Sequence, residues 1–97
     1  MIAIRMHVRN RERLLAACDE ELLGRTFAEG DARLRVSEIF YCGELVTEDI
    51  LRERMRSVTI MNLVGERTVS VAKESGYVSD DATITIEGVK HAQVVVL

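Results

Sequence analysis

The sequence predicts an α+β domain: a single-layer, mostly antiparallel sheet of about five strands, with two main helices packed on one face. Two observations carry this prediction. Apolar and polar side chains alternate near both ends of the chain, which is the two-residue period of half-buried strands. The middle of the chain holds segments with helical spacing and capping residues. Strands gathered around two helices, without a repeating strand–helix order, indicate α+β. At 97 residues, positions 1–97 are expected to form one domain.

The N-terminal half is expected to consist mainly of strands. Ile2 to Arg9 alternates cleanly, and a turn at Asn10–Glu12 leads to a returning strand over Arg13–Cys18. Asp19–Gly24 predicts a single helical turn, capped by its aspartate and ended by its glycine. A third strand over Ala32–Ser37 follows another short turn.

Two helices are expected next. Thr47 is a good N-cap before two acidic residues, and a narrow apolar stripe continues to about Arg56. The following segment is ambiguous, because Val58–Val64 is apolar enough for a buried strand. We favour a helix over about Thr59–Ser75, in which Gly65 lies mid-helix and permits close packing. A strand that ends before this glycine, with the helix starting there, is the alternative.

The C-terminal residues predict a hairpin. Ile84 and Ile86 alternate with polar residues, Glu87–Gly88 supplies the turn, and Val89–Leu97 returns as a valine-rich strand. This last strand suits an edge that pairs with another chain, which would give a homodimer. It equally suits a central position that is buried on both faces.

The composition excludes several classes of protein. A chain that is 47% hydrophobic and 30% charged is globular rather than disordered. No apolar run approaches the ~20 residues of a membrane span, so no membrane association is expected. An arginine at the fifth position argues against a secretory signal. Two cysteines require no oxidising compartment, so we expect a cytoplasmic protein with both thiols free.

Three segments together carry a family resemblance. They are Cys18–Gly24 (CDEELLG), Asn62–Arg67 (NLVGER) and Gly88–Val94 (GVKHAQV), accompanied by Phe40-Tyr41 and Gly43. In this order the chain resembles the archaeal domain of unknown function 424 family over almost its whole length. The resemblance implies an archaeal cytoplasmic protein of about this size and supplies no activity. Cys42 stands where the family more often has a small residue, which weakens any mechanism that needs both cysteines.

The functional prediction that we rank first is a basic surface. Arg5 and Arg9 face away from the core on the first strand, and Arg11 follows in the turn. Arg33 and Arg35 occupy the corresponding face of the third strand. If the two strands share one sheet, these cations crowd one solvated face and can neutralise phosphates despite a net charge of −3. The alternative is a solvated face whose arginines pair with acids on adjacent strands.

The kind of partner follows from the absence of aromatic residues on the two basic strands. Base stacking on single-stranded nucleic acid needs such residues. We therefore expect a non-enzymatic module that contacts the backbone of structured RNA, or the surface of a ribonucleoprotein or an acidic protein.

A small-ligand or catalytic pocket is the competing hypothesis. Its residues would be Asn62, Arg67, His91, Gln93 and Cys18. A catalytic thiol needs an imidazole or a positive environment to lower its pKa, and no nucleophile or oxyanion motif accompanies this cysteine. The simpler interpretation is structural: a satisfied amide, a guanidinium paired with an acid, and a core histidine.

Metal and cofactor sites are not expected. Cys18, Cys42, His7 and His91 are isolated, whereas structural zinc sites usually show paired ligands. The single Gly65 falls far short of a glycine-rich phosphate loop.

Overall fold

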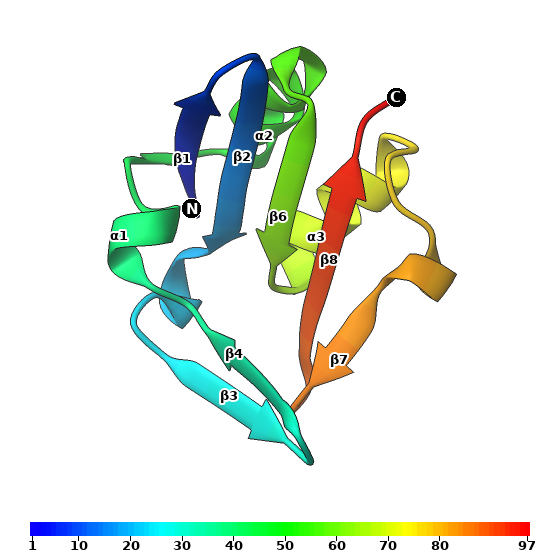
Figure 1. The fold of residues 1–97 in the computed structure, drawn as a ribbon. Coiled ribbons are helices and arrows are strands. Elements are labelled where there is room, and N and C mark those ends of the chain that lie inside the picture. The colour runs from blue at the N-terminus through cyan, green and yellow to red at the C-terminus, as the bar shows by residue number, and fades with distance from the viewer.

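The computed structural model describes residues 1–97 and contains a six-stranded sheet, a separate two-stranded hairpin and three α-helices (Figure 1). The strands are β1 (Ile2–Arg9), β2 (Glu12–Asp19), β3 (Thr26–Glu29), β4 (Ala32–Arg35), β5 (Glu44–Val46), β6 (Ile60–Val64), β7 (Ile84–Ile86) and β8 (Val89–Val95). The helices are α1 (Glu38–Tyr41), α2 (Glu48–Arg54) and α3 (Glu66–Glu74), with single 3-10 turns η1 (Glu20–Leu22), η2 (Met55–Ser57) and η3 (Asp80–Ala82).

The large sheet has the strand order β5-β1-β2-β6-β8-β7. All neighbouring strands in it are antiparallel except β2 and β6, which run parallel. The predicted α+β class with a mostly antiparallel sheet is therefore confirmed, although the sheet has six strands rather than about five.

Local sequence signals place several elements correctly. β1 pairs with β2 over its whole length, and Asn10 turns the chain between them with a φ of 56°, which asparagine tolerates. β7 and β8 meet at Glu87 and Gly88, which both have positive φ as a tight hairpin turn requires. Thr47 caps α2, since its Oγ1 accepts a hydrogen bond from the Ile50 amide at 3.3 Å.

One face of the large sheet packs against α2 and α3, which lie behind it in Figure 1. Alternate side chains of the central strands point to this face, so the two-residue period of each strand supplies the core. The fully buried members of this aliphatic cluster include Ile2, Leu15, Leu51, Met55, Met61, Leu63, Val69 and Val71.

The opposite face carries short side chains near the end of β2. Ala3, Ala16 and Cys18 are all fully buried there. Because these side chains are small, a second layer can approach the sheet closely, and the β3–β4 hairpin and α1 form that layer. Its buried members are Phe27, Leu34, Val36 and Tyr41.

The expected helix over Thr59–Ser75 is wrong in its first part, and the alternative is correct. Residues before Gly65 form β6, which pairs with β2 on one side and β8 on the other. A central strand is covered on both faces, so continuous apolarity here reflects burial of Leu63 on one side and Val64 on the other. Gly65 has a φ of 107°, which no helix interior accommodates.

The expectation that the first and third predicted strands share one sheet is also wrong. The predicted strand over Ala32–Ser37 is β4, and it pairs only with β3, which the sequence analysis missed. The hairpin is held at the β7–β8 turn by two carboxylates. Glu87 Oε1 accepts from the Ala28 amide at 2.7 Å, and Glu29 Oε1 accepts from the Glu87 amide at 2.9 Å.

A buried carboxylate at the end of β2 begins α3. Asp19 is 3% exposed, and its oxygens accept from the Arg67 amide at 3.1 Å and from the Thr68 amide and hydroxyl at 2.9 and 2.8 Å. Amides in the first turn of a helix have no partner within it, and a negative charge there opposes the positive end of the helix dipole. The expectation that Asp19 caps its own turn is wrong, because η1 has no side-chain cap.

Two features require glycine at position 65: its positive backbone angle φ and the close approach of the Asp19 carboxylate. A Cβ added at this position would lie 2.4 Å from Asp19 Cγ and 2.7 Å from both carboxylate oxygens. The strand–helix turn therefore approaches the capping group so closely that only glycine fits.

We expect Gly65→Ala to lower the free energy of unfolding by roughly 3 kcal/mol or more, because a left-handed backbone and a clash with buried atoms add together. Urea denaturation followed by circular dichroism measures this change. Gly88→Ala is the matched control: its φ is 78°, but nothing lies within 4 Å of the added Cβ. It should cost only about 1 kcal/mol. Equal losses in the two variants would contradict the clash.

We expect Asp19→Ala to lower the free energy of unfolding by about 2–4 kcal/mol, because buried backbone amides lose the carboxylate that accepts their hydrogen bonds. The same urea titration measures it. Glu20→Ala removes an equal charge from the adjacent exposed residue and should change the stability by less than about 0.5 kcal/mol. A loss for Asp19→Ala no larger than the control would show that α3 does not depend on this cap.

Candidate anion-binding surface

Five arginines that the sequence analysis selected lie along one margin of the molecule, which we call the arginine margin. They are Arg5, Arg9, Arg11, Arg33 and Arg35, and all five are exposed. β4 leads directly into α1, α1 lies beside β1, and β1 continues to the β1–β2 turn (Figure 1). The margin therefore follows a continuous path although its strands belong to two sheets.

The two strands of the margin point their arginines to the same side of the molecule. Ala3 on β1 belongs to the cluster beneath the hairpin, so Arg5 and Arg9, at even spacing from it, face that same side. Leu34 on β4 points down into this cluster, so Arg33 and Arg35 on its flanks point outward, away from the sheet. The arginines of β4 therefore lie on the outer surface of the second layer. They are on the same side of the molecule as Arg5 and Arg9 of β1.

The charges of the arginine margin are not neutralised within the chain. None of its five guanidinium groups lies within 4.0 Å of a carboxylate oxygen. The chain has 13 basic residues, and the six that are paired are Arg52, Arg54, Arg56, Arg67, Lys73 and Lys90. The unpaired ones all lie within residues 5–35. Adjacent-strand carboxylates therefore do not compensate these cations as the alternative interpretation required.

Arg5 has a structural contact in addition to its exposure. Its Nη1 donates to the Ile39 carbonyl of α1 at 3.1 Å, and His7 Nε2 donates to the Phe40 carbonyl at 2.8 Å. The His7 ring also stacks on Phe40, with ring centroids 4.6 Å apart. Carbonyls at the end of a helix have no partner within it. These two side chains of β1 hold the single-turn helix α1 on the sheet.

Two further arginines near the margin have other contacts. Arg13 Nε donates to the Ser57 carbonyl at 2.8 Å, which ties the start of β2 to η2. Arg25 lies over the ring of Phe27, with its guanidinium carbon 4.9 Å from the centroid. Arg25 was not among the predicted site residues, because β3, which follows it, carries too few residues to show a pattern. Acidic residues are present too: Glu38 lines a shallow hollow with Arg35.

Three residues of the competing pocket lie together on one face of the sheet, whereas Cys18 is fully buried and Arg67 lies elsewhere. Asn62 pairs with Gln93 across β6 and β8, and His91 lies two residues from Gln93 on the same face. This face has a hollow of about 350 Å³ over β2, β6 and β8. Asn62 Oδ1 accepts from the Tyr41 hydroxyl at 2.6 Å, and His91 Nδ1 donates to the Leu63 carbonyl at 2.9 Å. Asn62 therefore faces a buried phenol and His91 a backbone carbonyl.

Cys18 is poorly suited to nucleophilic chemistry. It is fully buried, and burial raises the pKa of its thiol to about 12, with a further contribution from the adjacent Asp19. Burial likewise raises the pKa of Tyr41 to about 12. Val64 lies between Cys18 and His91 in the sheet, so thiol and imidazole do not meet. A thiol in this environment stays protonated and behaves as a small apolar side chain.

Arg67 lies apart from that face, at the start of α3. It makes a two-pronged ion pair with Glu21, at 2.8 and 3.0 Å, and donates to the Met1 carbonyl at 3.1 Å. The hydrogen bonds from this guanidinium hold the pKa of Glu21 below its usual value. Its role is to fasten α3 to the N-terminus and η1.

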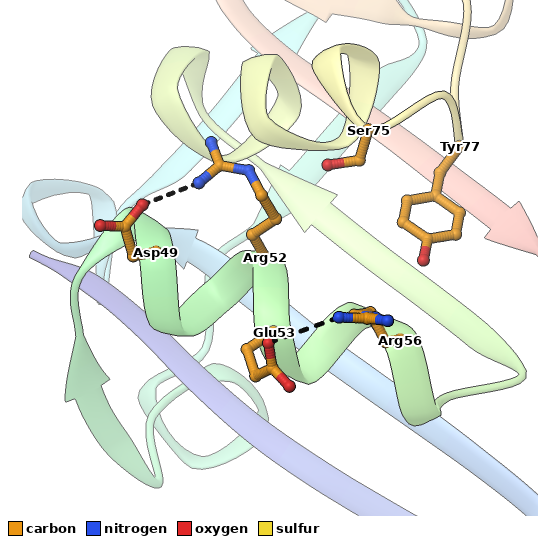
Figure 2. Close-up of a pocket in the computed structure, with 6 residues that line it drawn as sticks. All are labelled: Asp49, Arg52, Glu53, Arg56, Ser75 and Tyr77. Atoms are coloured by element: carbon orange, nitrogen blue, oxygen red, sulfur yellow. Dashed lines mark hydrogen bonds and ion pairs between the residues drawn. The ribbon is translucent and has the colours of Figure 1, made fainter.

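A groove between α2 and the end of α3 is lined by both charged and polar side chains (Figure 2). Each of its guanidiniums is compensated by a nearby carboxylate: Arg52 pairs with Asp49 within α2 at 2.9 Å, and Arg56 of η2 lies 3.8 Å from Glu53 of α2. Ser75 and Tyr77 complete the wall. The groove has a volume of about 360 Å³ but no excess of positive charge.

No three His, Cys, Asp or Glu side chains come together in a way that could hold a metal ion. None of the helices has the length and apolarity that crossing a bilayer requires.

Comparison with known proteins identifies the family but no activity. One solved structure, described as an uncharacterized conserved protein from Methanopyrus kandleri, superposes with a TM-score of 0.85 at 28% sequence identity. The match covers 99% of this chain and 91% of that one. No curated protein matches. The model of a family described as proteins of unknown function (DUF424) matches residues 6–97, so the chain belongs to the DUF424 family.

Proposed function

We propose that this protein is a non-enzymatic, cytoplasmic binding module that contacts the phosphate backbone of structured RNA through the arginine margin. The observation that carries the proposal is the lack of any carboxylate within 4.0 Å of its five guanidinium groups, in a chain whose other cations are mostly paired. Exposed, unpaired cations on one side of a molecule attract a polyanion even when the net charge is negative.

Arginine suits this role because its planar guanidinium binds two phosphate oxygens at once. Arg5 and Arg9 are four residues apart on a strand, which separates them by roughly 13 Å and lets them reach different phosphates. Phosphate contacts position a protein on nucleic acid without reading sequence. Backbone contact to a folded RNA therefore fits the margin.

The aromatic side chains favour structured over single-stranded RNA. Phe40 is stacked on His7 and half-buried, Tyr41 is buried, and Phe27 lies beneath the hairpin. None of these three rings is a free platform for unpaired bases, which single-strand binding requires, and the fourth, Tyr77, lies in the groove between α2 and α3. An acidic protein surface remains the second candidate, because it would use the same cations.

The proposal predicts that RNA affinity falls steeply with salt and depends on the arginine margin. The probe is a fluorescently labelled transfer RNA, titrated by anisotropy at several salt concentrations. Arg9→Ala/Arg11→Ala and Arg33→Ala/Arg35→Ala should each weaken binding by roughly tenfold at low salt. Each should also reduce the slope of log K against log salt by about 1–2, because two phosphate contacts are lost.

The matched control is Arg52→Ala/Arg56→Ala, which removes the same charge from the compensated groove between α2 and α3. It should leave both affinity and salt slope nearly unchanged. Equal losses in the margin and control variants would reduce the effect to net charge and remove the proposal. Margin-dependent binding of poly-glutamate without binding of the RNA would assign the surface to an acidic protein instead.

A further inference from the structure

The outer edge of β8 is open beyond His91. β7 pairs only with Val89–His91, whereas β8 continues along β6 to Val95. Figure 1 shows β7 beside the first part of β8 only. Ala82 of η3 lies across a hollow of about 350 Å³ from Ala92 and Gln93 and does not pair with them. Gln93 and Val95 are exposed, the latter to 69%.

The hydrogen bonds to β6 establish which backbone groups are free. The Gly65 amide donates to the Lys90 carbonyl at 2.8 Å, and the Val96 amide donates to the Thr59 carbonyl at 2.8 Å. In an antiparallel ladder the bonded residues alternate, so even-numbered residues of β8 bond to β6. The N–H and C=O groups of Gln93 and Val95 therefore point to the open side, where no strand receives them.

The unpaired stretches at the two edges of the large sheet differ in charge. β5 pairs with only Ile2–Ile4 of β1, so the edge of β1 is unpaired beyond Ile4. Two charged side chains, Arg5 and Arg9, lie along this unpaired stretch. Charged side chains on an edge oppose pairing with another strand. The open part of β8 carries no charge, no proline and no bulge between Ala92 and Val95. It lacks the charges, proline and bulge that commonly keep an edge strand unpaired.

We propose that the open edge of β8 pairs antiparallel with the same edge of a second copy of this chain. An identical strand run in the opposite direction offers an acceptor for each free donor and a donor for each free acceptor. The two-fold axis lies close to Val95, so the shielded Val89–His91 segments sit at the outer ends of the paired region. No like charges meet, because the paired residues are neutral.

Such a dimer has two consequences for its surfaces. The exposed Val95 side chains cover each other beside the hollow that Leu14 and Ile60 line. A two-fold axis perpendicular to the joined sheet keeps the same face of both copies on one side, so both arginine margins face that side. The dimer itself does not depend on the RNA-binding proposal.

The pairing is short, so the dimer is expected to be weak. A few residues of strand bury less than the ~1,000 Å² typical of a stable interface. A concentration-dependent monomer–dimer equilibrium with a dissociation constant in the micromolar range or above is therefore expected, rather than a permanent assembly.

Sedimentation equilibrium from about 10 µM to 1 mM tests the proposal, since this range spans weak association. The full chain should shift towards dimer mass as concentration rises. Val95→Lys, which puts two cations at the axis, should raise the dissociation constant tenfold or more. Val8→Lys is the matched control, because Val8 is 62% exposed and lies on the unpaired stretch of β1 beside Arg9. It should leave the equilibrium unchanged.

A second measurement does not depend on destabilising the protein. Val95→Cys in a Cys42→Ser background should form a covalent dimer in a glutathione redox buffer, because facing residues of paired strands lie within disulfide reach. Val8→Cys in the same background should not. A monomer at all concentrations, or a dimer that Val95→Lys leaves intact, would overturn the proposal, and so would equal cross-linking of the two cysteine variants.

Discussion

The buried carboxylate of Asp19 is the contact on which the arrangement of sheet and helix depends. It ends β2, begins α3 and leaves room for no residue but Gly65 between them. The amide of this glycine in turn donates to the Lys90 carbonyl, which brings β8 to the same point. The three sequence segments of the family resemblance thus meet at one junction. What these three segments share in the structure is this joint between β2, α3 and β8.

The sequence predicts best what is decided locally. Alternation identifies β1, β2 and the final hairpin, and Thr47 marks the start of α2, because each signal lies within a few residues of its effect. Asp19 is different, since its partner Thr68 lies 49 residues away. Its identity as a cap was recognisable, but the helix that it caps was not. The same limit hid β5, whose three residues carry no periodicity and become a strand only by pairing with β1.

The arginine margin shows the same division between local and long-range information. Alternation correctly indicates that Arg5 and Arg9 face one side of β1, and that Arg33 and Arg35 share a side of β4. Sheet membership could not be predicted from it, because the short side chains under the hairpin, such as Ala16, determine that β4 forms a second layer. The contact of Arg5 with α1 was hidden for a related reason: a single-turn helix leaves almost no pattern in a sequence.

The contacts of the margin separate the proposed binding from the stability of the fold, residue by residue. Arg9, Arg11, Arg33 and Arg35 are exposed and make no hydrogen bond or ion pair through their side chains, so nothing in the fold requires their charge. Unpaired exposed cations near one another repel slightly, and a fold gains nothing by keeping them together. Arg5 is the exception, because it also holds α1. These four charges are not needed by the fold, have no carboxylate partner and lie on one side of the molecule. The proposed contact with an anionic partner requires this arrangement.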